Sequence, residues 1–508
     1  MKLEQLLQGV DLIDISGDRH GEVTSVCYSA DKCVEGSLFV AIPGLQYDGH
    51  DFIPDAVSRG ARYIVQEKDF RLAHSITAIK VAGSRRALGI LARNFFQNPS
   101  ANLVLIAVIG TNGKTTITFL LESIFKAAGW KCGVLGTVNY RFGDKTYPAP
   151  NTTPESYDLQ KILREMADTG VTHVIAEVSS HALDLKRVDD CDFDLGIFTN
   201  LTRDHLDYHL TMENYFQAKK RFFTEVLPRS TKKHPQKMVV NKDDPWGQKI
   251  LADAPLAALT YGIDCDCQLR AEDFNLSLKG ITASINYSGT AMAVRSFLIG
   301  KFNLYNILAA AGAAAVLQVP ADVIEAGIGK LACVPGRLEK VETNSDFHVF
   351  VDYAHTDDAL KRVLQNLALL KKKRIITVFG CGGNRDRGKR PLMGEAAVSA
   401  SDITIVTSDN PRLEDPQTII AEIETGIEPA RIRKVAPDQL NEVRDAPCYT
   451  VIADRKKAIE AAIAIAGAAD IVLIAGKGHE DYQIVGTVKH PFDDRVIAAR
   501  ALQRRGQK

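Results

Sequence analysis

The stretch that most constrains the fold begins with an apolar, β-branched run at residues 104–109. It ends in the turn Gly-Thr-Asn-Gly-Lys-Thr-Thr at 110–116, and residues 118–128 then have the pattern of a helix. A strand, a glycine-flanked Gly-Lys-Thr turn and a helix, in this order, surround phosphates with backbone N–H groups and a helix N-terminus. The stretch therefore predicts a nucleotide-binding site.

Two residues of this turn have direct roles in the prediction. We expect Lys114 to lie along the β- and γ-phosphates and Thr115 to offer its hydroxyl to Mg²⁺. Val108 stands where the common phosphate-loop pattern has its first glycine, and Gly110 supplies flexibility at a different point. The alternative is a strand-to-helix turn with a chance lysine.

Composition narrows the class of protein. A chain of 508 residues is too long for one hydrophobic core and predicts about three domains. Lys+Arg and Asp+Glu both number 62, so no net basic field indicates nucleic acid or a membrane surface as a partner. The nine cysteines include no Cys-x-x-Cys pair, and we interpret them as ordinary core or surface residues.

Targeting signals are not expected. The first eight residues contain no apolar signal core, and no later apolar run is long enough to span a bilayer. The sequence therefore predicts a cytoplasmic location.

The first predicted domain, residues 1–98, is a small α/β unit. Residues 37–42 and 61–66 have the pattern of strands, and residues 52–58 have that of a helix. The polar, glycine-containing loop at 43–50 is either a plain connection or part of a ligand site.

The second predicted domain, residues 99–335, alternates strands and helices, which favours a largely parallel sheet with helices on both faces. Predicted strands at 172–178 and 193–199 lead to Glu177 and His205. Ligands of such sheets bind beyond the carboxyl ends of the strands, so both side chains are candidates to face the phosphates and complete a metal shell. The alternatives are a helix-capping acid and a hydrogen-bonded loop histidine.

Three further segments of this domain have weaker signals. Residues 212–225 predict a helix whose basic run at 219–221 is, by composition alone, a solvated face. Residues 239–271 have the pattern of short strands and turns, and an alanine-rich helix is expected to reach about residue 317, with Asn303 as its N-cap.

The third predicted domain, residues 336–508, is again α/β. Its expected strands are at 349–352, 374–379, 403–407 and 470–475. The last three run directly into polar loops at 380–391, 408–412 and 476–480. Loops at one edge of a sheet form a pocket, and the guanidinium, amide and carboxylate groups present there suit a zwitterion better than a second nucleotide.

Four motifs in this order resemble those of the Mur ligases: Gly110 to Thr116, Glu177-Val-Ser-Ser-His181, Thr202-Arg-Asp-His-Leu-Asp207 and Tyr353-Ala-His355. The resemblance covers essentially the whole chain. It implies a three-domain α/β architecture with an N-terminal UDP-sugar-binding domain, a central P-loop ATPase-like parallel sheet and a C-terminal Rossmann-like, amino-acid-binding domain. It also suggests a monomer.

The resemblance implies an activity as well. Such enzymes use ATP and Mg²⁺ to phosphorylate the terminal carboxylate of a UDP-linked muramoyl peptide, and the amine of an incoming amino acid then attacks the acyl phosphate. The version expected here adds meso-2,6-diaminopimelate to UDP-N-acetylmuramoyl-L-alanyl-D-glutamate, in peptidoglycan precursor synthesis. Lys114, Glu177 and His205 are the implied catalytic residues, together with Lys219, which the family carbamylates so that it becomes a metal ligand beside Thr115, Glu177 and His205.

The remaining implied contacts fall into three groups. For ATP they are Gly110, Thr111, Asn112, Gly113, Lys114, Thr115, Thr116, Asn303, Asn306 and Arg337, with Asp352 and His355 nearby. For the UDP-muramoyl peptide they are Ser29, Leu45, Gln46, Tyr47, Asn151, Thr152, Thr153, Ser179 and Arg187. For diaminopimelate they are Arg385, Asp409, Asn410, Pro411, Arg412, Gly476 and Glu480. The chain departs from the family pattern at Tyr28, Ala30 and Leu185.

The choice of amino acid depends on Arg412. Family members that take diaminopimelate have Asp-Asn-Pro-Arg, as residues 409–412 do, and lysine-adding members typically lack the arginine. Diaminopimelate differs from lysine by a distant carboxylate, which a guanidinium binds through two parallel hydrogen bonds. Glu480 would bind the far ammonium.

Three other functions remain as alternatives. The same ligase could use L-lysine. A folylpolyglutamate synthetase-like ligase shares the Gly-Thr-Asn-Gly-Lys turn but usually follows it with Gly-Ser. A regulatory P-loop ATPase would make no peptide product, and the zwitterion-like pocket argues against it.

Overall fold

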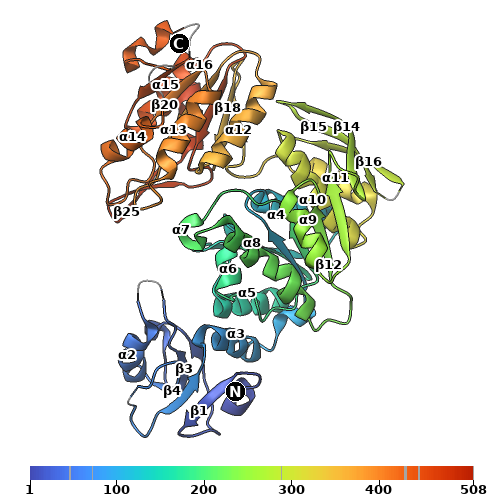
Figure 1. Cartoon of the computed structure of the whole chain (residues 1–508), viewed down its shortest axis with the longest axis vertical. Helices are drawn as coiled ribbons and strands as arrows, with labels where there is room; N and C mark the ends of the chain where they lie inside the picture. The colour runs from blue at the N-terminus through green and yellow to red at the C-terminus, as the bar shows by residue number, and fades with distance from the viewer. Residues whose placement is uncertain (45–46, 71, 288, 428–431, 444–446, 507–508) are drawn as a thin grey trace.

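The computed structural model describes every residue except 45–46, 71, 288, 428–431, 444–446 and 507–508. The described chain forms three α/β bodies, each with its own sheet, which follow one another along the long axis of the molecule (Figure 1). A mixed α/β architecture with parallel sheets is confirmed.

The first sheet has the order β1-β5-β4-β3-β2. Its strands are β1 (Leu12–Ser16), β2 (Val26–Cys27), β3 (Ser37–Val40), β4 (Ala61–Gln66) and β5 (Thr77–Val81), with helices α1 (Leu3–Leu6), α2 (Ile53–Ser58) and α3 (Ser84–Phe95). Only β1 is antiparallel to its neighbour; the others pair in parallel. The predicted strands and the helix at 52–58 are confirmed, although β3 ends at Val40.

The second sheet contains eleven strands in the order β16-β15-β14-β13-β12-β11-β6-β10-β7-β8-β9. Neighbours from β14 to β7 pair in parallel, and antiparallel strands extend both ends. The strands are β6 (Val104–Ile109), β7 (Cys132–Leu135), β8 (Asn139–Phe142), β9 (Lys145–Pro148), β10 (His173–Glu177), β11 (Leu195–Phe198), β12 (Lys237–Asn241), β13 (Ala258–Gly262), β14 (Leu269–Ser277), β15 (Gly280–Tyr287) and β16 (Thr290–Ser296). The prediction of a largely parallel sheet is therefore correct for its centre.

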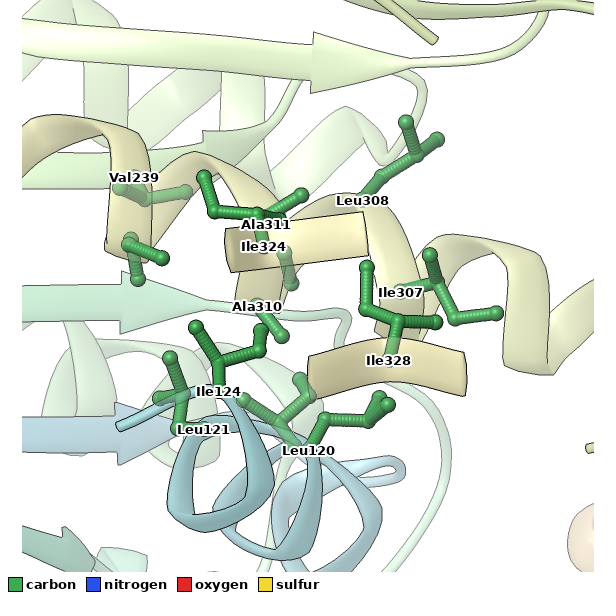
Figure 2. Close-up of a cluster of buried hydrophobic side chains, with 14 of the residues drawn as sticks. Leu120, Leu121, Ile124, Val239, Ile307, Leu308, Ala310, Ala311, Ile324 and Ile328 are labelled. Carbon is green, nitrogen blue, oxygen red and sulfur yellow. The ribbon is translucent and has the colours of Figure 1, made fainter. Parts of the chain in front are cut away.

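Helices cover both faces of this sheet. On one face α4 (Lys114–Ala127), α10 (Lys301–Val316) and α11 (Ala321–Lys330) bury an aliphatic core, and Figure 2 shows Leu120, Leu121 and Ile124 of α4 beside Ile324 and Ile328 of α11. Alanines of α10 keep its side chains short where these helices meet. The other face carries α5 (Ser156–Asp168), α6 (Ser180–Asp184), α8 (Met212–Arg221) and α9 (Pro245–Asp253), and the short helix α7 (Leu206–His209) contacts α8.

Three local predictions in this domain need correction. The helix after the phosphate loop begins at Lys114, four residues earlier than the pattern at 118–128 indicates, because Gly113 supplies a left-handed N-cap with φ 89°. Asn303 is not an N-cap: the helix starts after Gly300, and the Asn303 Nδ2 donates to the Ile299 carbonyl from within the first turn. Residues 239–271 contain a helix, α9, which Asp244 caps by accepting from the Trp246 N–H.

The third sheet has the order β17-β18-β23-β19-β20-β22-β21. Its strands are β17 (Glu339–Val341), β18 (His348–Asp352), β19 (Ile375–Phe379), β20 (Ile403–Val406), β21 (Arg433–Lys434), β22 (Cys448–Val451) and β23 (Ile471–Ala475), and β24 (Tyr482–Val485) pairs with β25 (Val488–Pro491) in a separate hairpin. Its helices are α12 (Asp357–Leu370), α13 (Lys389–Ala400), α14 (Pro416–Glu424), α15 (Arg455–Ile465) and α16 (Asp494–Gly506). Since β23, β19 and β20 are parallel neighbours, their three following loops meet at one edge, as predicted.

Across the described residues, no helix combines the length and the apolar character needed to cross a membrane. All nine cysteines are present as free thiols.

Candidate active site

The phosphate loop lies at the centre of the second sheet, between β6 and α4. Gly110 and Gly113 have φ of 151° and 89°, and a Cβ at these positions would overlap the Thr199 hydroxyl and the Asn306 amide respectively. The Thr111 N–H donates to the Asn200 carbonyl at 2.9 Å. The loop is therefore held in a glycine-dependent conformation by the end of β11 and by α10.

Lys114 turns back over this loop. Its Nζ donates to the carbonyl oxygens of Gly110 at 3.0 Å and Thr111 at 2.8 Å. Burial lowers its pKa, and the carboxylates of Glu177 and Asp204 act against that shift. A lysine that is desolvated and bonded to neutral carbonyls lacks an anionic partner of its own, which is the environment expected for a phosphate-binding ammonium.

Glu177 and Thr115 lie together beside the loop, because β10 pairs with β6 and ends next to it. The buried Glu177 carboxylate accepts from the Thr115 hydroxyl at 3.1 Å and from the N–H and hydroxyl of Thr137 at 3.0 and 2.9 Å. Thr137, which the sequence reading missed, fixes the carboxylate so that its position does not depend on a ligand.

Lys219 is buried, so the prediction of a solvated basic face at 219–221 is wrong for this residue. Its side chain is 1 % exposed, and its Nζ donates to the Gly110 carbonyl at 2.8 Å and lies 4.7 Å from the centre of the Tyr215 ring. Burial and the nearby Lys114 ammonium hold the pKa of Lys219 well below its usual range. The lowered pKa favours the neutral amine over the ammonium.

His205 occupies a strained position at the start of α7. It has φ 53°, and its Nε2 lies 3.4 Å from the Asp204 Oδ2. The His181 ring meets the His205 ring edge to face at 4.8 Å. Asp204 and His181 belonged to motifs that the sequence analysis quoted without assigning them a role. Such local strain is typical of functional sites.

Residues proposed for the muramoyl peptide gather around Thr153. The Thr153 hydroxyl donates to the Glu177 carbonyl at 2.8 Å and accepts from the Ser179 N–H at 3.0 Å. Arg187 donates to the Thr153 carbonyl at 3.3 Å, and the Thr152 hydroxyl lies 3.1 Å from that of Thr137. Asn151, the other residue proposed for the muramoyl peptide in this domain, accepts a hydrogen bond from the Tyr140 hydroxyl through its backbone carbonyl. The structure thus brings these side chains close to the phosphate loop.

The first domain contributes the most distant candidates. The Ser29 hydroxyl donates to the Asp31 carboxylate, and the Tyr47 side chain is 72 % exposed. Neither side chain is therefore part of the hydrophobic core. Leu45 and Gln46 lie outside the described residues.

The nucleotide candidates on α10 and at the start of the third domain meet the loop from the other side. Asn306 donates to the Asn303 side chain at 2.9 Å. Arg337 donates to the Thr115 hydroxyl at 3.3 Å and lies 4.7 Å from the centre of the Tyr353 ring. Asp352 accepts the backbone N–H of Leu338 and that of Ala354, each at 2.7 Å. His355 directs its ring Nδ1 to the Tyr353 carbonyl at 2.9 Å.

The loops that follow β19, β20 and β23, where the sequence predicts the amino-acid site and which we call the third-sheet pocket, share a buried polar network. Lys477, which the sequence reading did not select, is fully buried and donates to the Asn410 Oδ1 at 3.0 Å and the Glu480 Oε2 at 3.1 Å. Asn410 donates in turn to Glu480 at 2.9 Å. Asp409 is buried beside them, and Gly476 takes φ 118° at the end of β23. Pro411 is also buried and precedes Arg412.

Two guanidinium groups border the same pocket. Arg412 has φ 53° and donates to the Gly383 carbonyl at 2.8 Å. Burial lowers the pKa of Arg412, and the positive charge of Arg385 contributes to the shift. Two cations this close favour an anion between them.

The side chains of Thr115, Glu177 and His205, which the family resemblance implies as metal ligands, fit Mg²⁺ in chemistry. They offer a hydroxyl, a buried carboxylate and an imidazole, and Mg²⁺ usually takes few protein ligands and completes its shell with water and substrate phosphates. The part of the chain that the structure describes has no cluster of three or more His, Cys, Asp or Glu side chains that could hold a metal ion.

Family comparisons agree with this geometry. Three family models match in succession: "Mur ligase family, catalytic domain" over residues 22–96, "Mur ligase middle domain" over 108–314, and "Mur ligase, glutamate ligase domain" over 336–478. Together with the phosphate loop, these matches identify an ATP-dependent acid–amino-acid ligase, and the chain belongs to the Mur ligase family.

Particular relatives are similar over the whole length. The UDP-N-acetylmuramoyl-L-alanyl-D-glutamate--2,6-diaminopimelate ligase of Geobacter metallireducens is 46% identical over 510 residues, with 100% of both chains covered. The ligase of the same name from Geobacillus kaustophilus is 42% identical over 508 residues, again with 100% of both chains covered. A solved structure of a ligase of that name has a TM-score of 0.70 and 32% identity, and the match covers 100% of each chain.

Proposed function

We propose that this chain uses ATP to join meso-2,6-diaminopimelate to UDP-N-acetylmuramoyl-L-alanyl-D-glutamate, in the synthesis of peptidoglycan precursors. The observation that supports it most is the charge pattern of the third-sheet pocket, where Arg385 and Arg412 border a network that ends in Glu480. Diaminopimelate carries a carboxylate and an ammonium at its far end. The carboxylate matches the positive charge of Arg385 and Arg412, and the ammonium matches the negative charge of Glu480. The names of the full-length relatives support the same substrate pair.

The ATP end of the reaction is assigned to the phosphate loop. Backbone N–H groups of residues 110–116 and the Lys114 ammonium would bind the phosphates, and the Asn303, Asn306 and Arg337 side chains would lie toward the nucleoside. Thr115, Glu177 and His205 would hold Mg²⁺, which when bound screens the charge of phosphate and carboxylate oxygens.

Lys219 is proposed to act as a carbamate. Its neutral amine attacks CO₂, a C–N bond forms, and one proton leaves to solvent, so that a neutral buried amine becomes an anionic carbamate. Burial and the low pKa of Lys219 favour the neutral amine that this step needs. The new carboxylate would then act as a metal ligand beside Glu177 and His205.

The muramoyl peptide would lie across the first two domains. We place its uridine diphosphate near Ser29 and the 45–47 segment, and its peptide near residues 151–153, Ser179 and Arg187. We also propose 1–98, 99–335 and 336–508 as the domain boundaries. The enzyme is proposed to act as a monomer in the cytoplasm, where ATP and nucleotide-linked sugars are found.

The chemistry has two steps. A glutamate carboxylate oxygen of the muramoyl dipeptide attacks the γ-phosphorus of ATP, and ADP leaves with the electrons of the broken P–O bond. The neutral amine of diaminopimelate then attacks the acyl carbon, inorganic phosphate leaves, and the ammonium proton passes to solvent. Lys114 neutralises charge that develops on the phosphates, which is the form of electrostatic stabilisation that acyl and phosphoryl transfer require.

A direct test measures products with both acceptors. The purified protein is mixed with ATP, Mg²⁺ and the UDP-muramoyl dipeptide, and then with meso-diaminopimelate or L-lysine. The proposal expects ADP and a new amide with diaminopimelate in equal amounts, and far less product with lysine. ADP release without an amide would favour a regulatory ATPase, and equal use of lysine would remove the assigned role of Arg412.

A further inference from the structure

A pair of cysteine thiols lies inside the first domain, outside the site described above. Cys27 ends β2, and Cys33 follows the 3₁₀ turn Ala30–Lys32, so five residues lie between them in the sequence. Their Sγ atoms are 2.8 Å apart, which is closer than the van der Waals separation of two sulfur atoms. Disulfide bonding needs a further approach to only about 2.0 Å.

The surroundings of the pair hold the two sulfurs in place. Cys27 is 4 % exposed and Cys33 is 7 % exposed, and both belong to an apolar cluster with Phe39, Ile53 and Ile64. Cys27 is fixed by the parallel pairing of β2 with β3. The Cys33 N–H donates to the Ala30 carbonyl at 3.1 Å. The strand pairing and the turn therefore hold the two thiols next to each other.

The two thiols are not equivalent. A hydrogen bond with Cys27 lowers the pKa of Cys33, whereas that hydrogen bond and burial raise the pKa of Cys27. The thiolate is the reactive form of cysteine, so we expect an oxidant to react first with Cys33, the thiol with the lower pKa. Its neighbours Lys32 and Val34 are exposed, which places this end of the pair next to solvent.

We propose that Cys27 and Cys33 are an oxidation site that forms an intramolecular disulfide and thereby alters the turn that carries Ser29. With hydrogen peroxide as oxidant, the Cys33 thiolate attacks one peroxide oxygen, the O–O bond breaks, and a sulfenic acid and hydroxide form. The Cys27 thiol then displaces hydroxide from the Cys33 sulfur, an S–S bond forms, and the released hydroxide and the thiol proton give water. Overall, two thiols and one peroxide become one disulfide and two waters.

The effect on substrate rests on the proposed function, in which Ser29 contacts the uridine end of the muramoyl substrate. Ser29 lies between the two cysteines, and its carbonyl accepts the Lys32 N–H at 3.1 Å. Drawing the sulfurs together tightens this turn and displaces Ser29. We expect a rise in KM for the UDP-muramoyl dipeptide of about fivefold, equal to about 1 kcal/mol, with kcat unchanged.

The pairing is tested by peptide mapping that does not depend on activity. The full chain is treated with hydrogen peroxide, alkylated and cleaved by trypsin. Cleavage after Lys32 separates Cys27, in the peptide 20–32, from Cys33, in the peptide 33–59, so only a disulfide keeps them joined. The proposal predicts the joined peptides, a loss of two hydrogen atoms in mass, and reversal by dithiothreitol. Separate alkylated peptides, or a sulfinic acid at Cys33 without joining, would overturn it.

Variants separate the pairing from its effect on KM. Cys33→Ser and Cys27→Ser should each keep their KM after peroxide treatment, whereas Cys448→Ser, which removes another buried thiol in the third domain, should respond as the unaltered chain does. Joined peptides with an unchanged KM would refute the link to Ser29. If the chain has no ligase activity at all, the proposed function fails, and the peptide map still decides whether the thiols pair.

Discussion

Replacing Arg412 by alanine should damage the use of diaminopimelate selectively. One Nη of Arg412 is held by the Gly383 carbonyl at 2.8 Å, which orients the guanidinium and leaves its other N–H groups for a ligand. Alanine removes the guanidinium and leaves the position with a non-glycine residue, so the strain of φ 53° is kept. The change therefore isolates the side chain.

The size of the effect follows from the contact it removes. A bidentate guanidinium–carboxylate pair comprises two hydrogen bonds to a charged group, each worth about 1.5–3 kcal/mol, so kcat/KM for diaminopimelate should fall by about 10²- to 10⁴-fold. L-Lysine has no carboxylate at that end, and its low kcat/KM should change by less than about threefold. The KM for ATP should stay the same, because Arg412 belongs to the third-sheet pocket.

The assay compares steady-state kcat/KM for diaminopimelate, lysine and ATP. Arg387→Ala is the matched control, since Arg387 is an exposed arginine of a neighbouring loop that pairs with Glu414. Arg412→Lys keeps the charge but not the planar fork and should recover only part of the loss. Equal losses toward ATP and diaminopimelate, or toward lysine and diaminopimelate, would refute the reasoning and indicate a structural role.

Three further substitutions test the phosphate loop and its neighbours. Lys114→Ala should reduce ATP turnover by at least about 10³-fold while the thermal midpoint stays close to that of the unaltered chain, and retained turnover would move the nucleotide site elsewhere. Lys219→Ala should lose activity that added short carboxylic acids partly restore, because they replace the missing carboxylate; no restoration at any concentration would count against carbamylation. Gly113→Ala should weaken ATP binding by about 1–3 kcal/mol in calorimetry, since its Cβ meets the Asn306 amide and its φ of 89° suits glycine, and an unchanged affinity would contradict the assigned loop geometry.

Local signals explain which parts of the fold could be predicted from the sequence. The phosphate loop was recognisable because strand, glycine turn and helix follow one another within residues 104–127. The third-sheet pocket was recognisable for a related reason: its polar loops begin where apolar runs end, and parallel strands put those ends at one edge.

Long-range contacts account for what the sequence did not reveal. Lys219 lies in a basic helical run that predicts exposure to solvent, whereas in the fold it is buried and contacts Gly110, 109 residues away. Arg337 reaches Thr115 across 222 residues, and no local pattern predicts that pairing. Lys477 carried no signal in the sequence, because its burial depends on hydrogen bonds to Glu480 and to Asn410 of another loop. Asn303 was misread because asparagine is common at N-caps, whereas here a glycine precedes the helix.

The proposed reaction requires that ATP phosphorylates the muramoyl carboxylate before an amine reaches it. Labelling both oxygens of that glutamate carboxylate with oxygen-18 tests this claim most directly, because the label leaves only if the carboxylate has been bonded to phosphorus. With diaminopimelate present, we predict that one labelled oxygen appears in inorganic phosphate for each amide formed. Amide formation with unlabelled phosphate would contradict the claim.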